Sequence, residues 1–147
     1  FFRTASWATL QFDYDNDVDL DMFIVNNRSR PVLYRNDGGN QNGWLRVRVA
    51  GPLMGIGARL TVTAAPGRRP QVHEVSAGNN FLSQNELTAH FGLGPGDAPV
   101  HRLVVRWQDG SQQTFNDVPR NKLFTLSRGN GLVAVAAQPA SESACAK

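Results

Sequence analysis

Hydrophobic and polar residues alternate in short runs along most of the chain, a pattern typical of half-buried β-strands. In the run 44–49, for example, Trp44, Arg46 and Arg48 alternate with three aliphatic residues, so one face is apolar and the other polar. No segment shows a sustained helical period. Strands are predicted at 8–12, 22–25, 31–35, 44–49, 58–64, 71–76, 100–107, 111–115 and 123–127.

Glycine-rich turns separate these predicted strands. Asp109-Gly110 lies between two of them and indicates a tight hairpin, because such a turn needs positive φ at its centre. Residues 85–88 could form one helical turn, which Gly92 and Gly94 would keep short. Many short strands joined by such turns predict an all-β fold, an antiparallel β-sandwich.

The polar segment 36–43 divides the chain into unequal parts. Residues 1–38 are predicted to form a small unit of three strands, which must pack on something because so few strands bury little surface. Residues 39–128 are predicted to form the main sandwich. Residues 129–147 are rich in Ala and Ser, have no clear period and are predicted to form a flexible tail.

Composition narrows the function classes. The chain has 147 residues and is 41% hydrophobic, with no apolar run near the roughly 20 residues that cross a bilayer. A single cysteine, Cys145, rules out an internal disulfide, and no signal peptide is visible from Phe1 onward. Thirteen arginines contribute to a net charge of +3 but are scattered along strands, so nucleic-acid binding is not favoured.

One acidic run gives the clearest indication of a chemical role in this sequence. Five aspartates stand at alternate positions within nine residues, and their like charges repel unless something neutralises them. Ca²⁺ takes about six to eight oxygen ligands and favours carboxylates from one short loop. The predicted metal ligands are Asp13, Asp15, Asp17, Asp19 and Asp21.

One residue argues against a bound metal, and an alternative without a metal also exists. Val18 stands at the sixth position of the run, where a calcium loop usually has Gly because its φ is positive. The acidic run could instead be a solvated turn neutralised by nearby Arg28, Arg30 or Arg35. The sequence leaves both alternatives open, and in either case the role is structural rather than catalytic.

Other candidate chemistry is sparse. The three histidines and Cys145 show no zinc-ligand spacing, and Ser83 lacks the glycines of a nucleophile elbow, so no enzyme is predicted. Trp44, with Arg46 and Arg48 on the same strand face, could contact a ligand such as a glycan. Alternatively, Trp44 covers a seam between strands.

Two stretches resemble known families. The acidic run, with Ser6-Trp7-Ala8 before it and Leu33-Tyr34-Arg35-Asn36-Asp37 after it, resembles the last FG-GAP/VCBS repeat of integrin-like β-propellers. The segments that follow resemble the ASPIC/UnbV domain of cartilage acidic protein-like exported proteins. They are Gly55-Ile56-Gly57-Ala58-Arg59-Leu60-Thr61-Val62, Glu74-Val75-Ser76-Ala77-Gly78, Phe81-Leu82-Ser83-Gln84, His90-Phe91-Gly92-Leu93-Gly94 and Leu103-Val104-Val105-Arg106-Trp107.

The resemblance implies that residues 1–38 are part of a propeller blade and that the acidic run is a structural Ca²⁺ loop. It also implies an extracellular, periplasmic or cell-surface location and a binding or assembly role. The expected partner is another protein or the remainder of a propeller, because a lone blade needs neighbours to cover it. One alternative is a carbohydrate-binding module or an accessory to a carbohydrate-active or biosynthetic enzyme. Another is a structural subunit that completes a partner's β-sheet.

Overall fold

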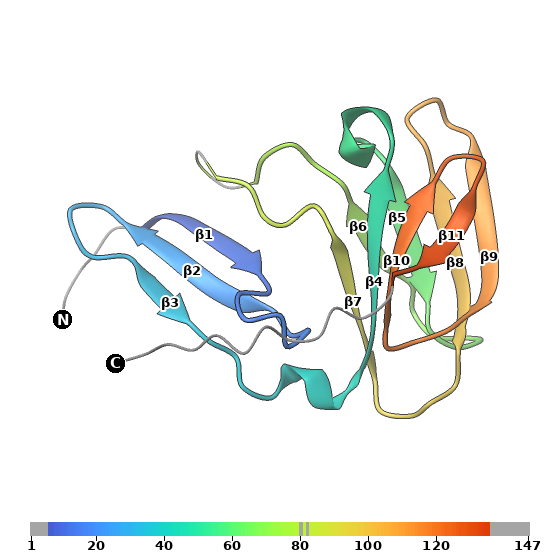
Figure 1. The fold of residues 1–147 in the computed structure, drawn as a ribbon, viewed down its shortest axis with the longest axis horizontal. Helices are drawn as coiled ribbons and strands as arrows, with labels where there is room; N and C mark the ends of the chain where they lie inside the picture. Colours follow the sequence, from blue (N-terminus) through green and yellow to red (C-terminus); the bar gives the residue numbers. More distant parts are fainter. Residues whose placement is uncertain (1–5, 80, 82, 136–147) are drawn as a thin grey trace.

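The computed structural model describes residues 6–79, 81 and 83–135, which fold into a small sheet beside a larger two-layered unit (Figure 1). The small sheet has the strand order β1-β2-β3, and the larger unit has the orders β11-β10-β4-β7 and β6-β5-β8-β9. No helix among the described residues is long and apolar enough to cross a membrane. The predicted all-β fold class is confirmed.

The small sheet, called the blade sheet below, is an antiparallel meander. It consists of β1 (Ser6–Phe12), β2 (Asp21–Asn26) and β3 (Val32–Tyr34). Leu10 pairs with Phe23, and Phe23 with Leu33, so one face is apolar. Met22 pairs with Tyr34 on the other face, where both side chains are exposed. A sheet with apolar residues on both faces is the kind that other layers cover on both sides.

The larger unit is a sandwich of two four-stranded sheets. One sheet contains β4 (Gly43–Ala50), β7 (Ala89–Gly94), β10 (Lys122–Ser127) and β11 (Gly131–Ala134). The other contains β5 (Arg59–Thr63), β6 (Gln71–Glu74), β8 (Val100–Arg106) and β9 (Gln112–Val118). The 3₁₀ turns η1 (Gly39–Gln41) and η2 (Pro52–Gly55) flank β4. Most pairs are antiparallel, but β4 and β10 are parallel.

The core lies between the two sheets of the sandwich and follows the alternation in the sequence. Leu45 and Val47 of β4 face Leu60 of β5 and Leu103 of β8 in one cluster, and each has 0% exposure. Burying such a side chain contributes about 1.5–3 kcal/mol, so this layer strongly favours folding. The predicted strand 44–49 is therefore a central core strand.

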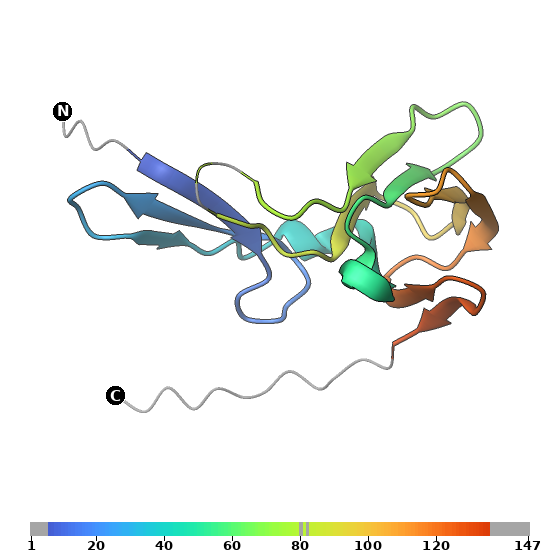
Figure 2. The same ribbon diagram turned by 90° about the horizontal axis from the view of Figure 1, so that it is seen from above.

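A loop from the sandwich reaches the blade sheet. The segment between β6 and β7 runs beside β1 in both views (Figures 1 and 2). The amide of Gln11 donates to Asn85 Oδ1 at 3.1 Å, and the amide of Glu86 donates to the Gln11 carbonyl at 3.3 Å. The rings of Trp7 and Phe81 meet edge to face at 6.1 Å. The sandwich thus covers part of the β1 edge.

Two strands differ from the sequence prediction. The sequence predicts no strand over residues 89–94, where β7 lies, but Ala89 and Phe91 alternate into the core. β11 falls within the predicted tail 129–147, where Leu132 packs against the core and β11 pairs with β10. Residues 136–147 of that predicted tail, including Cys145, lie outside the described residues, as does Phe1.

The predicted hairpin at Asp109-Gly110 is confirmed. Gly110 has φ +83°, and Trp107 and Ser111 pair across the turn through an amide-to-carbonyl hydrogen bond of 2.8 Å. The Asp109 carboxylate accepts hydrogen bonds from Ser111 and Arg128, which lower its pKa to about 2. This turn joins β8 to β9 at the far end of the sandwich from the acidic loop.

Candidate functional site

The acidic run forms the turn between β1 and β2, called the acidic loop below (residues 13–21). Two of its residues have left-handed backbones, Asn16 with φ +61° and Val18 with φ +83°. The loop therefore turns sharply at the predicted place even though a β-branched residue disfavours that conformation. Val18 holds a strained conformation that only its surroundings can maintain.

Three of the five aspartates converge. Carboxylate oxygens of Asp13, Asp15 and Asp21 lie within 4.8 Å of one another. Ca²⁺–oxygen distances are about 2.3–2.6 Å, so oxygens this close can bind the same ion. Asp21 is buried and Asp15 is exposed, which leaves one side of the cluster open to water ligands. Asp17 and Asp19 were also predicted as ligands, but their carboxylates are not part of this cluster.

Backbone amides hold the buried carboxylates. Asp21 Oδ2 accepts from the amide of Tyr14 at 2.7 Å, and its Oδ1 accepts from the amide of Asn36 at 2.9 Å. Asp19 Oδ2 accepts from the amide of Gly39 at 3.0 Å. The acidic loop is thereby fixed to the segment that leads into the sandwich, and these carboxylates are oriented before any ion arrives.

Asp17 has a different, local role in the loop. Its Oδ1 accepts from the amide of Asp19 at 3.1 Å, an Asx-type turn. This bond stabilises the sharp bend around Val18. The structure thus gives Asp17 and Asp19 loop-shaping contacts and brings the other three predicted ligands together.

An ion pair joins the acidic loop to the sandwich. Arg46 Nη1 lies 2.5 Å from Asp13 Oδ2, and Arg46 Nη2 lies 2.8 Å from each oxygen of Glu86. The side chain of Asp13 is 3% exposed and that of Arg46 is 11% exposed. Asp13 Oδ1 is also buried, and no group in the described part of the chain donates a hydrogen bond to it.

Arg28, Arg30 and Arg35, the arginines of the alternative, form no ion pair with the loop among the described residues, although the charges of Asp15 and Asp21 also act on Arg35. Arg35 pairs with Asp37 at 2.6 Å, and that carboxylate raises the pKa of Arg35. Arg46 offsets one negative charge, but it also pairs with Glu86. Asp15 and Asp21 have no ion-pair partner among the described residues.

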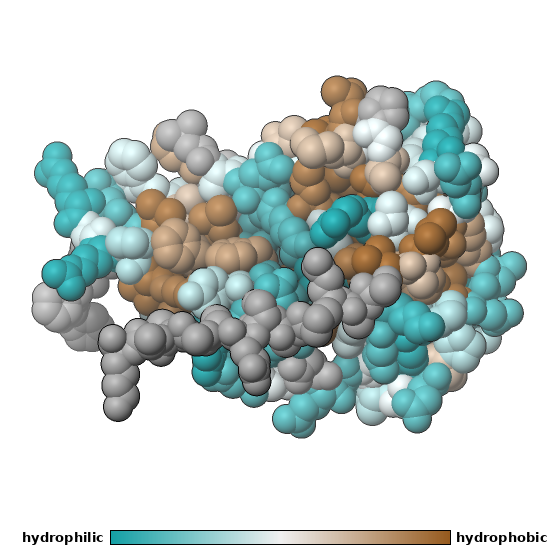
Figure 3. Space-filling model, viewed as in Figure 1, coloured by the Kyte–Doolittle hydropathy of each residue, from teal (hydrophilic) through white to brown (hydrophobic). Residues whose placement is uncertain are grey.

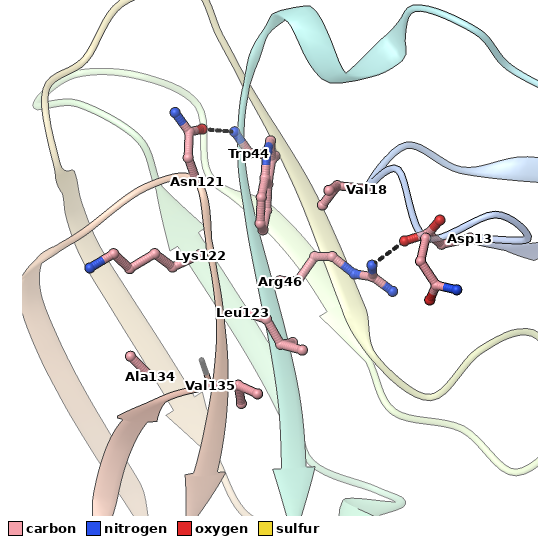
Figure 4. Close-up of a pocket in the computed structure, with 10 residues that line it drawn as sticks. Asp13, Val18, Trp44, Arg46, Asn121, Lys122, Leu123, Ala134 and Val135 are labelled. Carbon is pink, nitrogen blue, oxygen red and sulfur yellow. Dashed lines mark hydrogen bonds and ion pairs between the residues drawn. The ribbon is translucent and has the colours of Figure 1, made fainter. Parts of the chain in front are cut away.

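The predicted ligand-contact residues separate into two groups. Trp44 and Arg46 line a groove of about 590 Å³ between the acidic loop and the sandwich (Figure 4). Arg48 is exposed further along β4 and does not line it. The other lining residues are Asp13, Asn16, Val18, Asn121, Lys122, Leu123, Ala134 and Val135.

Two residues of the site escaped the sequence reasoning. Glu86 comes from the loop before β7 and completes the pair with Arg46, 40 positions away. His90 lies directly opposite Arg46 on β7. Burial, together with the charge of Arg46, lowers the pKa of His90, which favours the neutral imidazole. No sequence motif indicates that either residue lies near Arg46, because that proximity depends on the pairing of β4 with β7.

The sandwich with its attached blade sheet defines an all-β module, and comparison of the sequence assigns its family. The sequence model described as ASPIC and UnbV matches residues 49–133, which cover most of the sandwich. The chain belongs to the ASPIC and UnbV family.

Curated relatives named cartilage acidic protein 1 match the chain. The one from Xenopus tropicalis is 30% identical over 133 residues, covering 88% of this chain and 18% of that protein. The one from Homo sapiens is 31% identical over 110 residues, covering 71% of this chain and 16% of that protein. The chain therefore spans less than a fifth of the length of these relatives.

Proposed function

We propose that this chain is a non-enzymatic, extracytoplasmic binding or assembly module of a larger exported protein, with a structural Ca²⁺ in the acidic loop. The proposed metal site is supported by the convergence of Asp13, Asp15 and Asp21. It is also supported by the buried Oδ1 of Asp13, which has no hydrogen-bond partner among the described residues. A buried carboxylate oxygen without a donor is costly, and a cation removes that cost.

The donor set fits a hard cation. All the converging atoms are carboxylate oxygens, with no sulfur or imidazole in the cluster as described. Asp13, Asp15 and Asp21 would hold the ion, with water on the open side at Asp15. The ion supplies positive charge that stabilises the loop. It would also fix the β1–β2 turn against the segment that leads to β4.

The assembly role is supported by the blade sheet. Apolar side chains gather over it in Figure 3, and Val32, Leu33 and Tyr34 of β3 are all exposed. Within the part of the chain that the structure describes, the order β1-β2-β3 leaves β3 as an open edge. Further propeller blades of the same protein would cover these faces, as the FG-GAP/VCBS resemblance implies. The relatives' name refers to cartilage, a tissue rich in extracellular matrix, which favours an extracellular setting for this chain.

Thermal melting tests this proposal. Ca²⁺ should raise the melting temperature of the full chain above its value in chelator by several degrees, because the ion binds the folded loop only. Asp21→Asn should abolish the increase, whereas Asp37→Asn, outside the cluster, should keep it. Equal melting temperatures with Ca²⁺ and chelator would rule out the structural metal.

A second candidate function, glycan binding, is favoured by the groove. The half-buried ring of Trp44 lies there beside the amide side chain of Asn121, a combination of apolar face and hydrogen-bonding group that suits a sugar ring. A third, completion of a partner's sheet, would use the open edge of β3. Binding to immobilised glycans that Trp44→Ala removes would favour the second over the other two.

A further inference from the structure

Arg46 connects two carboxylates that come from opposite sides of the junction between the blade sheet and the sandwich. Its Nη1 donates to Asp13 Oδ2 at 2.5 Å, and its Nη2 donates to both oxygens of Glu86 at 2.8 Å. The side chain of Asp13 is 3% exposed, and that of Glu86 is 26% exposed. This junction is therefore joined by charge-assisted hydrogen bonds that water screens weakly.

The position of the Arg46 guanidinium is set by the sandwich. Its strand, β4, lies in the interior of the sheet, where Arg46 pairs with His90 on β7 and Leu123 on β10. Glu86 holds one end of the planar group, so the direction of Nη1 toward the acidic loop is fixed. Figure 4 shows the guanidinium extending from β4 to Asp13.

This geometry decides which oxygen of Asp13 remains for an ion. Oδ2 is occupied by Arg46, and the buried Oδ1 has no donor in the parts of the chain that the structure describes. Asp13 also offers an oxygen to the cluster with Asp15 and Asp21. Free rotation of the carboxylate would exchange the two oxygens, and the hydrogen bond from Arg46 prevents that exchange.

We propose that Arg46 is the positioning residue of the acidic loop: it orients Asp13 so that Oδ1 faces the cation, and it couples cation binding to the packing of the blade sheet on the sandwich. This inference rests on the proposed Ca²⁺ site. Hydrogen bonds to metal-ligating carboxylates commonly change metal affinity by about 10–100-fold. Coupling of this kind is reciprocal, so Ca²⁺ also strengthens the junction.

Arg46 affects Ca²⁺ affinity in two opposite ways, through its charge and through the orientation of Asp13. The direction of the change in affinity when Arg46 is replaced therefore tests the inference. The guanidinium repels a cation, so removing it would raise Ca²⁺ affinity if charge alone mattered. If orientation matters more, removing it lowers the affinity. Arg48 provides the matched control, because it lies two residues further along the same strand with the same charge and is exposed.

The experiment is calorimetric titration of the full chain with CaCl₂. Arg46→Met is expected to weaken Ca²⁺ binding about 10-fold or more, whereas Arg48→Met leaves it within about 2-fold of wild type. Glu86→Gln removes the carboxylate that holds Nη2 of Arg46, so it is also expected to weaken Ca²⁺ binding. Equal or tighter binding by both Arg46→Met and Glu86→Gln overturns the inference. If Arg46→Met fails to fold, the Glu86→Gln titration decides alone.

A distance measurement tests the coupling separately. Spin labels at Arg30→Cys and Arg69→Cys, in a Cys145→Ser background, report the separation of the blade sheet from the sandwich. Ca²⁺ should narrow the distance distribution in otherwise wild-type protein and leave that of Arg46→Met unchanged at saturation. Equal narrowing in both proteins would overturn the coupling. Absence of Ca²⁺ binding by wild type would instead refute the proposed metal site itself.

Discussion

Arg46 of β4 and Asp13 of the acidic loop are 33 positions apart in the sequence, yet Nη1 and Oδ2 lie 2.5 Å apart and both side chains are largely buried. The pair joins the blade sheet to the sandwich at the edge of the carboxylate cluster. Breaking a buried pair from one side typically costs about 3–5 kcal/mol, because it leaves a buried charge unpaired. The acidic loop is thus part of the junction between the two units.

Replacing Val18 with glycine should stabilise the chain. Val18 has φ +83°, and a left-handed non-glycine residue costs about 1–3 kcal/mol, whereas glycine adds about 0.5–1 kcal/mol of unfolded-state entropy. We expect the free energy of unfolding of Val18→Gly, measured by urea denaturation in chelator, to rise by about 1 kcal/mol. Val72→Gly, on the ordinary strand β6, should lower it. A decrease for both variants would show that Val18 is unstrained.

Gly55 should tolerate no side chain. It has φ +76°, and a Cβ at this position would collide with the side chain of Val49 in β4. Gly67 has nearly the same φ, +75°, but open space around it. Gly55→Ala should therefore lower the free energy of unfolding by about 2 kcal/mol more than Gly67→Ala does. If chemical denaturation shows that the two variants lose the same free energy of unfolding, backbone strain alone explains why position 55 requires glycine.

Stability should fall in mildly acidic solution because of buried histidines. Burial lowers the pKa of His73, which lies edge-on to Phe91 at 6.2 Å, below its ordinary value of 6.5. The unfolded chain therefore binds a proton first, and stability present above pH 6.5 is lost as the pH falls. His73→Gln should reduce the loss in unfolding free energy between about pH 7.5 and about pH 5.5. If His73→Gln loses as much unfolding free energy over this pH range as the wild-type protein does, His73 does not have this role.

Much of the fold could be predicted from alternation alone. The run 44–49 is a central core strand because every second residue is aliphatic, and that property is local. β7 could not be predicted in the same way, since Gly92 and Gly94 interrupt it and only pairing with β4 shows that Phe91 is core. Local patterns identify strands whose own residues form a continuous apolar face.

The candidate site was predictable only in part for a similar reason. The aspartate spacing indicated a cation, and three of the residues do converge. Asp17 instead bonds to the amide of Asp19 two residues on, and Asp19 bonds to the amide of Gly39, which the sequence does not place nearby. Glu86 and Arg46 meet through long-range strand pairing. Contacts of that kind depend on topology, which no short motif encodes.

The groove should bind ligand through Trp44 if the glycan hypothesis is right. Its ring lines the groove next to Val18 and Arg46. Trp44→Ala should abolish binding to a glycan array without loss of Ca²⁺ binding, while Trp107→Phe, outside this groove, should keep both. Loss of the Trp107 indole hydrogen bond to Gln113 lowers stability only slightly, by about 1 kcal/mol. Retained glycan binding by Trp44→Ala would exclude the groove as the sugar site.

Calorimetric titration of the wild-type chain with CaCl₂, beside Asp13→Asn and Asp21→Asn, tests the central claim most directly. The account predicts one Ca²⁺ per chain for wild type. It predicts at least a 10-fold loss of affinity for each variant, because each removes a charged ligand from a cluster within 4.8 Å. No heat of binding for wild type, or unchanged binding by both variants, would contradict a metal site formed by Asp13, Asp15 and Asp21.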